Sequence, residues 1–112
     1  MELPFELSPE RVAELLRGGQ IQLVDVREDY EREAGHVAGS RHVPLAELTS
    51  ATPTIDPSQP VVFVCRVGAR SSMAAWSFAR AGYDAHNLEG GMMAWAAAGL
   101  PLEPEGGVVA DH

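Results

Sequence analysis

Hydrophobic residues along the chain gather in short runs, and several of these runs have the composition of β-strands. Residues 61–65 read Val-Val-Phe-Val-Cys and show no alternation with polar residues. A short apolar run of this kind is typical of a central parallel strand that is covered on both faces. Residues 21–26 are similar. Shorter strands are predicted over 5–7, 41–43 and 83–88.

Helix signals lie between these strands. Ser8 is a good N-cap, Pro9 suits the first helical position, and Val12 and Leu15 recur at helical spacing. A second clear helix is predicted to run to about residue 81, with Ser71 or Ser72 as its N-cap. The remaining expected pieces are single turns over 28–33 and 45–48 and a small helix over 92–98.

Alternation of strands and helices predicts the α/β class, with a mainly parallel sheet. The chain has 112 residues, which suits one domain. Residues 49–60 contain three prolines and few apolar residues, so we expect a surface connection there. From Glu103 onward the chain is acidic and rich in glycine, and this tail is expected to be frayed.

The net charge of the chain disfavours some classes of binding partner. Sixteen acidic residues face eight basic ones, all arginine, for a net charge of −8. Such a surface repels nucleic acid and anionic membranes at long range. No apolar run approaches the roughly 20 residues of a membrane helix. The first residues show no secretory signal, so a cytoplasmic location is expected.

The main candidate for a reactive residue is Cys65. It is the only cysteine and lies at the end of the most hydrophobic predicted strand. Ligand sites in open α/β sheets lie at the carboxyl ends of strands. In the loop that follows, Gly68 permits an unusual backbone angle, and Arg66 and Arg70 add positive charge. Backbone N–H groups of such a loop and the next helix N-terminus stabilise an anion. The pattern therefore favours a reactive thiolate over its alternative, a core cysteine beside solvated arginines.

Four segments in order resemble the signatures of rhodanese-homology domains, the thiosulfate sulfurtransferases. Residues 65–71, Cys-Arg-Val-Gly-Ala-Arg-Ser, are similar to the active-site loop of that family. The other three are Leu-Val-Asp-Val-Arg-Glu (23–28), Gly-His-Val-Ala-Gly-Ser with Val-Pro-Leu (35–45), and Leu-Glu-Gly-Gly-Met-Met-Ala-Trp with Gly-Leu-Pro (88–101). Ser40 stands where alanine is common in the family, a mild departure.

This resemblance implies a single rhodanese-like domain over residues 5–102, followed by the tail 103–112. It implies a five-stranded sheet with helices on both faces. Cys65 would accept a sulfane sulfur as a persulfide, and cyanide or a thiol would then remove it. The loop residues that would bind the anionic donor are Arg66, Val67, Gly68, Ala69, Arg70 and Ser71. Neither a metal nor an organic cofactor is expected.

The expected partners are a small anionic sulfur donor and a thiol or cyanide acceptor. A thioredoxin-like or sulfur-carrier protein could supply that thiol, and the default oligomeric state is a monomer. Two alternatives stay open: a non-catalytic binding or sulfur-relay module, and a cysteine-based phosphatase or arsenate reductase. The latter enzymes place five residues between Cys and Arg, whereas only four separate Cys65 from Arg70.

Other polar and aromatic residues are interpreted more conservatively. Asp25 and Arg27 could line the rim of the site, but a structural ion pair is favoured. The acidic run 28–33 is interpreted as a solvated face. His36 is expected to bond backbone, and His42 and His86 are assigned no role. Trp95 is expected in the core, and Trp76 on the surface, where it could mark a partner contact.

Overall fold

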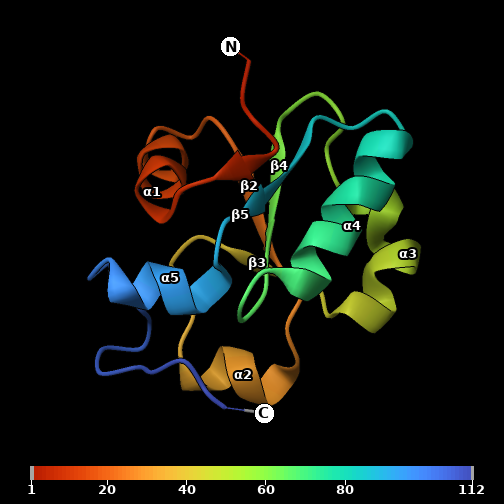
Figure 1. Cartoon of the computed structure of the whole chain (residues 1–112). Helices are drawn as coiled ribbons and strands as arrows, with labels where there is room; N and C mark the ends of the chain where they lie inside the picture. Colours follow the sequence, from red (N-terminus) through yellow and green to blue (C-terminus); the bar gives the residue numbers. More distant parts are fainter. Residues whose placement is uncertain (1, 112) are drawn as a thin grey trace.

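A computed structural model describes residues 2–111 and contains one five-stranded sheet in the order β1-β5-β4-β2-β3. Every strand pair is parallel, which confirms the predicted class. The carboxyl ends of the strands therefore meet at one edge, in the lower half of Figure 1. The strands are β1 (Glu6–Leu7), β2 (Gln22–Asp25), β3 (Arg41–His42), β4 (Val61–Val64) and β5 (Ala85–Leu88).

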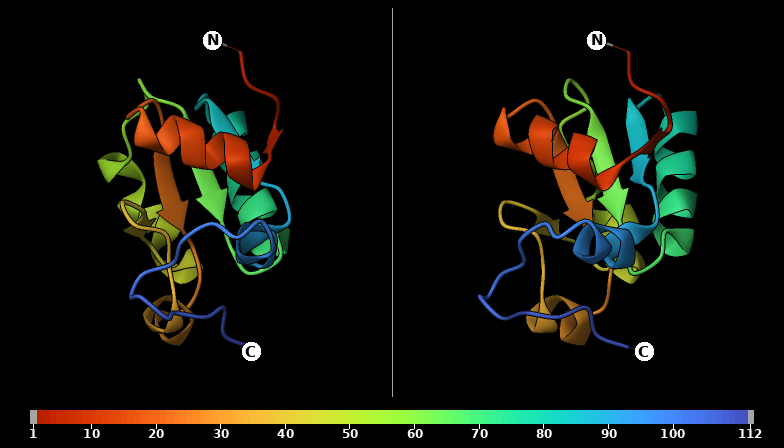
Figure 2. Two further views of the ribbon diagram at one scale, coloured as in Figure 1. Left: turned by 90° about the vertical axis from the view of Figure 1, so that its left-hand side faces the viewer. Right: turned by 60° about the vertical axis from the view of Figure 1, so that its left-hand side comes forward.

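Helices cover both faces of the sheet, as expected. Figures 1 and 2 show α1 and α5 on one face and α3 and α4 on the other, with α2 beyond the carboxyl ends of the strands. The helices are α1 (Pro9–Arg17), α2 (Asp29–Ala34), α3 (Leu48–Ala51), α4 (Ala69–Arg80) and α5 (Gly91–Ala97). Two 3₁₀ turns, Leu45–Glu47 and Thr52–Thr54, flank α3.

The central strand β4 is buried along its whole length because it lies between two apolar clusters. Phe63 faces the α4 side, where its ring lies 4.9 Å from that of Phe78. Val62 and Val64 face the α1 side, with Leu15 and Trp95. Residues 61–65 do not alternate between apolar and polar side chains because each side chain of the strand packs into one of the two apolar clusters.

Two segments contain structure that the sequence-based predictions lack. Residues 49–60 lie mostly at the surface, as expected, but most of α3 and a 3₁₀ turn form there, because buried Leu48 and Ile55 anchor the segment to the core. The tail is not frayed: the Glu103 and His36 backbones exchange two hydrogen bonds, and the N–H of Val108 donates to Ala34 O at 2.9 Å. These backbone bonds hold the tail beside α2. Residue 112 of the predicted tail lies outside the described residues.

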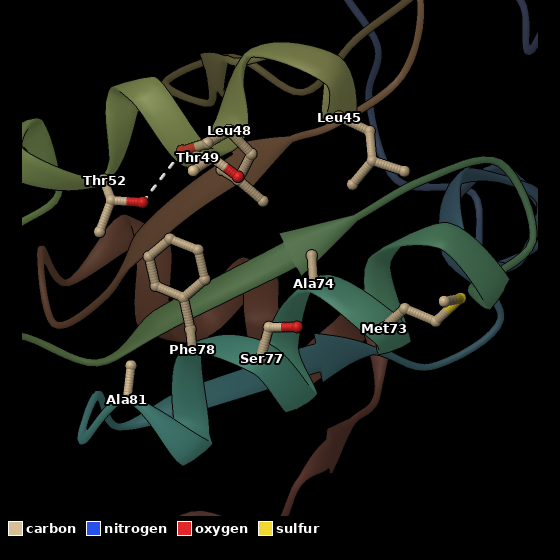
Figure 3. Close-up of a pocket in the computed structure, with 9 residues that line it drawn as sticks. All are labelled: Leu45, Leu48, Thr49, Thr52, Met73, Ala74, Ser77, Phe78 and Ala81. Carbon is tan, nitrogen blue, oxygen red and sulfur yellow. Dashed lines mark hydrogen bonds between the residues drawn. The ribbon is translucent and has the colours of Figure 1, made fainter.

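Two cavities open on the helical faces. One, of about 340 Å³, lies between α3 and α4, and Figure 3 shows Leu48, Met73 and Phe78 on its walls. The other, of about 580 Å³, lies beside α1 and α5 and includes Trp95. Neither includes Cys65 among its lining residues. Within residues 2–111, no helix has the length and apolar character needed to cross a bilayer.

Candidate active site

The loop after β4 turns sharply at Gly68 and leads directly into α4. Gly68 has φ +106°, a backbone conformation that side chains disfavour, and it is the N-cap residue of the helix. The helix begins at Ala69, so the prediction of Ser71 or Ser72 as N-cap was wrong. Glycine replaces a side-chain cap because the chain must reverse within three residues of Cys65. Ser71 consequently lies in the first helical turn, with its hydroxyl directed inward.

Two backbone N–H groups and one hydroxyl group converge on the sulfur of Cys65. The backbone N–H of Gly68 lies 3.1 Å from Sγ, that of Ser71 lies 3.4 Å away, and the Ser71 Oγ lies at 3.3 Å. Cys65 itself is only 1% exposed. Donors aimed at one buried atom stabilise negative charge on it, so the loop is arranged to support a thiolate or a sulfur anion attached to it.

The first turn of α5 fixes the loop from behind. Met92 N–H donates to Cys65 O at 2.8 Å, and Met93 N–H donates to Arg66 O at 3.0 Å. A Cβ at Gly91 would approach Cys65 O to 2.5 Å, so this close backbone contact requires glycine. With its carbonyls occupied by α5, the loop keeps its N–H groups directed at the sulfur.

Arg70 extends from α4 toward α2 and forms a bidentate ion pair with Glu31, with N–O distances of 2.9 and 3.0 Å. Burial disfavours ionisation of Glu31, but hydrogen bonds from Arg70 and from the Glu28 backbone outweigh it and lower the pKa of this carboxyl. The same pair raises the pKa of Arg70. The interpretation of residues 28–33 as a solvated face was therefore wrong for Glu31, which is fully buried.

Arg66 is held by the C-terminal tail. Its Nε donates to Ala110 O at 3.2 Å, and its guanidinium lies 3.0 Å from a carboxylate oxygen of Asp111. Between the two arginines, Val67 and Ala69 are exposed at the outer surface of the loop. Both predicted anion-binding arginines thus flank the loop, and each already has a carboxylate partner.

Asp25 and Arg27 lie at the end of β2 but do not line an open rim. Arg27 is fully buried, donates twice to the Asp25 carboxylate at 2.8 and 2.9 Å, and bonds Gly35 O at 2.8 Å. Arg32 adds a longer contact to Asp25 at 3.5 Å. The favoured interpretation, a structural ion pair, agrees with this geometry.

The histidines and tryptophans also have structural contacts. His36 bonds the backbone carbonyl of Arg32, and His42 bonds that of Arg27. His86 lies between Pro4 O and the Asp84 carboxylate. Trp95 is buried, as predicted, and its indole N–H donates to Pro101 O. Trp76 is 59% exposed on α4, also as predicted.

Sequence reasoning missed the polar residues behind the sulfur. Asn87, near the end of β5, is buried and accepts a 2.5 Å hydrogen bond from the Ser71 hydroxyl. Its amide nitrogen donates to the Glu6 carboxylate of β1 at 2.9 Å. A signal was available in the polar Asn87 beside Leu88 within the predicted strand 83–88, because an amide that is buried in a sheet needs hydrogen-bond partners.

Comparisons with known proteins agree with this geometry. The family model described as "Rhodanese-like domain" matches residues 8–98. Thiosulfate sulfurtransferase GlpE of Pseudomonas aeruginosa is 34% identical over 90 residues, which cover 80% of this chain and 81% of GlpE. The crystal structure of a rhodanese-related protein from Thermoplasma volcanium superposes with a TM-score of 0.84 at 24% identity, covering 91% of this chain and all of that one.

A regulator also contains a similar segment. HTH-type transcriptional regulator Rv0324 of Mycobacterium tuberculosis is 42% identical over 97 residues, which cover 81% of this chain. The match spans 42% of the length of that regulator. A domain of this kind therefore occurs both in short sulfurtransferases and as part of longer proteins. Since the family model covers most of the chain and several relatives agree with it, this protein belongs to the rhodanese-like domain family.

Proposed function

We propose that the protein is a sulfurtransferase that moves a sulfane sulfur from thiosulfate, or from another persulfide donor, through Cys65. The Cys65 thiolate attacks the outer sulfur of thiosulfate and forms a new S–S bond. The S–S bond within thiosulfate breaks, and sulfite leaves with the electron pair. An acceptor thiolate or cyanide then attacks the outer sulfur of the persulfide, and Cys65 departs as a thiolate.

The observation that carries this proposal is the convergence of two backbone N–H groups on one sulfur atom. The N–H groups of Gly68 and Ser71 lie 3.1 and 3.4 Å from Sγ. Sγ carries negative charge at the start of the first step, as the attacking thiolate, and regains it during the second step, as the departing thiolate. Fixed donors stabilise that charge without having to reorganise. Only four residues separate Cys65 from Arg70, so the ring is shorter than that of the cysteine phosphatases.

Arg66 and Arg70 supply the positive charge for the sulfite portion of the donor. Because Asp111 and Glu31 already bind them, a dianionic donor competes with these carboxylates for the two guanidinium groups. Asp111 is 92% exposed and is the easier partner to displace, whereas Glu31 is buried. We therefore assign Arg66 to contact the incoming anion and Arg70 to contribute charge while it remains paired. Neither step requires a metal or an organic cofactor.

A turnover assay across donors and acceptors tests the proposal. Thiosulfate and glutathione persulfide serve as donors; cyanide, a dithiol and a thioredoxin-like protein serve as acceptors. The proposal requires turnover by the wild-type protein with at least one pair and none by Cys65→Ser. If no pair is turned over, the chain is a binding module of this family. Hydrolysis of an aryl phosphate in place of sulfur transfer would favour the phosphatase alternative.

A further inference from the structure

The hydroxyl of Ser71 has one proton and three competing acceptors. Its Oγ lies 2.5 Å from Asn87 Oδ1, 3.3 Å from Cys65 Sγ and 3.4 Å from Gly68 O. A carbonyl oxygen can only accept, so the short contact requires that the proton point toward Asn87. In this arrangement the Ser71 oxygen presents a lone pair to the sulfur. A lone pair accepts from a thiol S–H but repels a thiolate.

The orientation of the Asn87 amide is fixed from its other end. Its Nδ2 donates to both Glu6 carboxylate oxygens, at 2.9 and 3.2 Å, and lies 3.4 Å from Gly68 O. Glu6 stands opposite Asn87 in the β1–β5 register. Because acceptors occupy the amide nitrogen end, Oδ1 is kept facing Ser71. If the amide turned over, Nδ2 would donate to Ser71 and release the hydroxyl proton toward the sulfur.

We infer that Glu6 and Asn87 are positioning residues that set the direction of the Ser71 O–H and thereby withhold a hydrogen-bond donor from the Cys65 sulfur. The inference deepens the proposed function, since it concerns the atom that would carry the transferred sulfur. Other charged groups around the loop are Arg66, Arg70 and the buried Glu31. They act on the sulfur by charge, whereas Asn87 acts through the hydrogen bond of a neutral amide.

Alkylation of Cys65 by iodoacetamide near pH 7 measures the thiolate without any sulfur transfer, so this test can fail independently of the proposed function. A hydrogen bond to a charged group changes an equilibrium by about tenfold or more. We therefore expect Glu6→Gln and Asn87→Ala to alkylate about three- to tenfold faster than wild type. Ser71→Ala removes the lone pair that faces the sulfur but offers no donor in its place, so it should alkylate no more slowly than wild type and more slowly than Glu6→Gln. If the hydrogen bonds that link Glu6, Asn87 and Ser71 served the fold alone, alkylation of all three variants would be slower than that of wild type.

Controls separate the hydrogen bond from simple loss of negative charge. Glu89→Gln removes an exposed carboxylate two residues after Asn87 and should leave the rate unchanged. In a Ser71→Ala background, Glu6→Gln should have no effect, because its influence passes through the Ser71 hydroxyl. The inference would be overturned if Glu6→Gln accelerated alkylation equally in the Ser71→Ala background. It would also be overturned if Glu89→Gln accelerated alkylation as much as Glu6→Gln does. An unchanged or slower alkylation rate in folded Glu6→Gln would also overturn the inference. Because Glu6 is exposed, this variant still tests the inference if Asn87→Ala does not fold.

Discussion

The ends of β2 and β4 are neighbours in the sheet, and each combines a buried polar residue with arginine. Asp25 pairs in register with Val64, so the Asp25–Arg27 pair lies beside the Cys65 loop. At the end of β2, the Asp25 carboxylate and the Arg27 guanidinium bind each other below the surface. At the end of β4, two backbone N–H groups point at a sulfur atom.

A structural polar cluster and a reactive one at the same sheet edge differ in what their donors bind. In the β2 cluster the Asp25 carboxylate already neutralises Arg27 through Nε and Nη2. The guanidinium nitrogen that has no partner among residues 2–111, Nη1, is buried, so the pair holds the loop and has little capacity for another anion. In the β4 loop the donors meet a weak acceptor, a sulfur, whose charge can increase during a reaction. Both strand ends carry charged residues. Only at the end of β4 do hydrogen-bond donors converge on a nucleophile.

The largest expected effect comes from Cys65→Ser. Replacing sulfur by oxygen changes little volume and keeps an acceptor for Gly68 and Ser71, so the thermal midpoint should stay near that of wild type. Sulfur transfer should be abolished, because the serine hydroxyl forms no persulfide. Thermal unfolding and the turnover assay measure the two halves of this prediction. Turnover in a cleanly purified variant would place the nucleophile elsewhere.

The β2 cluster should show the opposite response. Asp25→Asn leaves the Arg27 charge buried without its counterion, which costs about 3–5 kcal/mol of folding free energy. That is a large part of the stability of a small domain, so urea unfolding should detect it readily. The matched control is Asp29→Asn, since Asp29 is 84% exposed and its loss should cost less than about 0.5 kcal/mol. Equal stability of the two variants would remove the distinction between the clusters.

Arg70→Ala should weaken the use of thiosulfate. Because Arg70 stays paired with Glu31 and acts on the donor by charge alone, its loss should remove about 1 kcal/mol, or about fivefold in kcat/KM. The variant also leaves Glu31 buried without its partner, so Arg70→Ala combined with Glu31→Gln is measured alongside to separate folding from substrate use. Unchanged kcat/KM for thiosulfate in both variants would show that Arg70 serves the fold alone.

The sequence predicts the parts of this site that depend on local order. Cys65 ends an apolar run, and Gly68 permits the turn that follows. Arg66 and Arg70 lie within five residues of Cys65 in the chain, so this spacing alone places them near the sulfur. Glu31 could not be placed in this way, because it lies 39 residues from Arg70 and looks like one member of an exposed acidic run. Glu6 lies 81 residues from Asn87, and only the β1–β5 pairing brings them together.

The tail illustrates the same limit for the fold. Its glycine and acidic residues indicate a frayed segment when they are considered alone. Its contacts with Ala34 and Arg66 come from distant parts of the chain. The longer strands β2, β4 and β5, by contrast, are predictable because their burial is nearly continuous in sequence.

An effect smaller than that of Asp25→Asn, with a defined pH dependence, is expected from Glu31→Gln. The pKa of Glu31 is lowered in the folded protein, so its ionisation stabilises the fold above the unfolded value of about 4.3. That stabilisation is lost as the pH falls through the folded pKa. Wild type should therefore exceed the variant by about 1–2 kcal/mol near pH 7, and the gap should narrow near pH 3. Urea unfolding at both pH values measures it; a gap independent of pH would contradict the role of the charge.

The most direct test of the central claim is intact-protein mass spectrometry of the wild-type chain after incubation with thiosulfate, followed by treatment with cyanide. The account predicts that the wild-type protein gains one sulfur atom, that peptide mapping places it on Cys65, and that cyanide removes it. Cys65→Ser should gain none under the same conditions. A folded wild-type protein that gains no sulfur from thiosulfate or from glutathione persulfide would contradict the account.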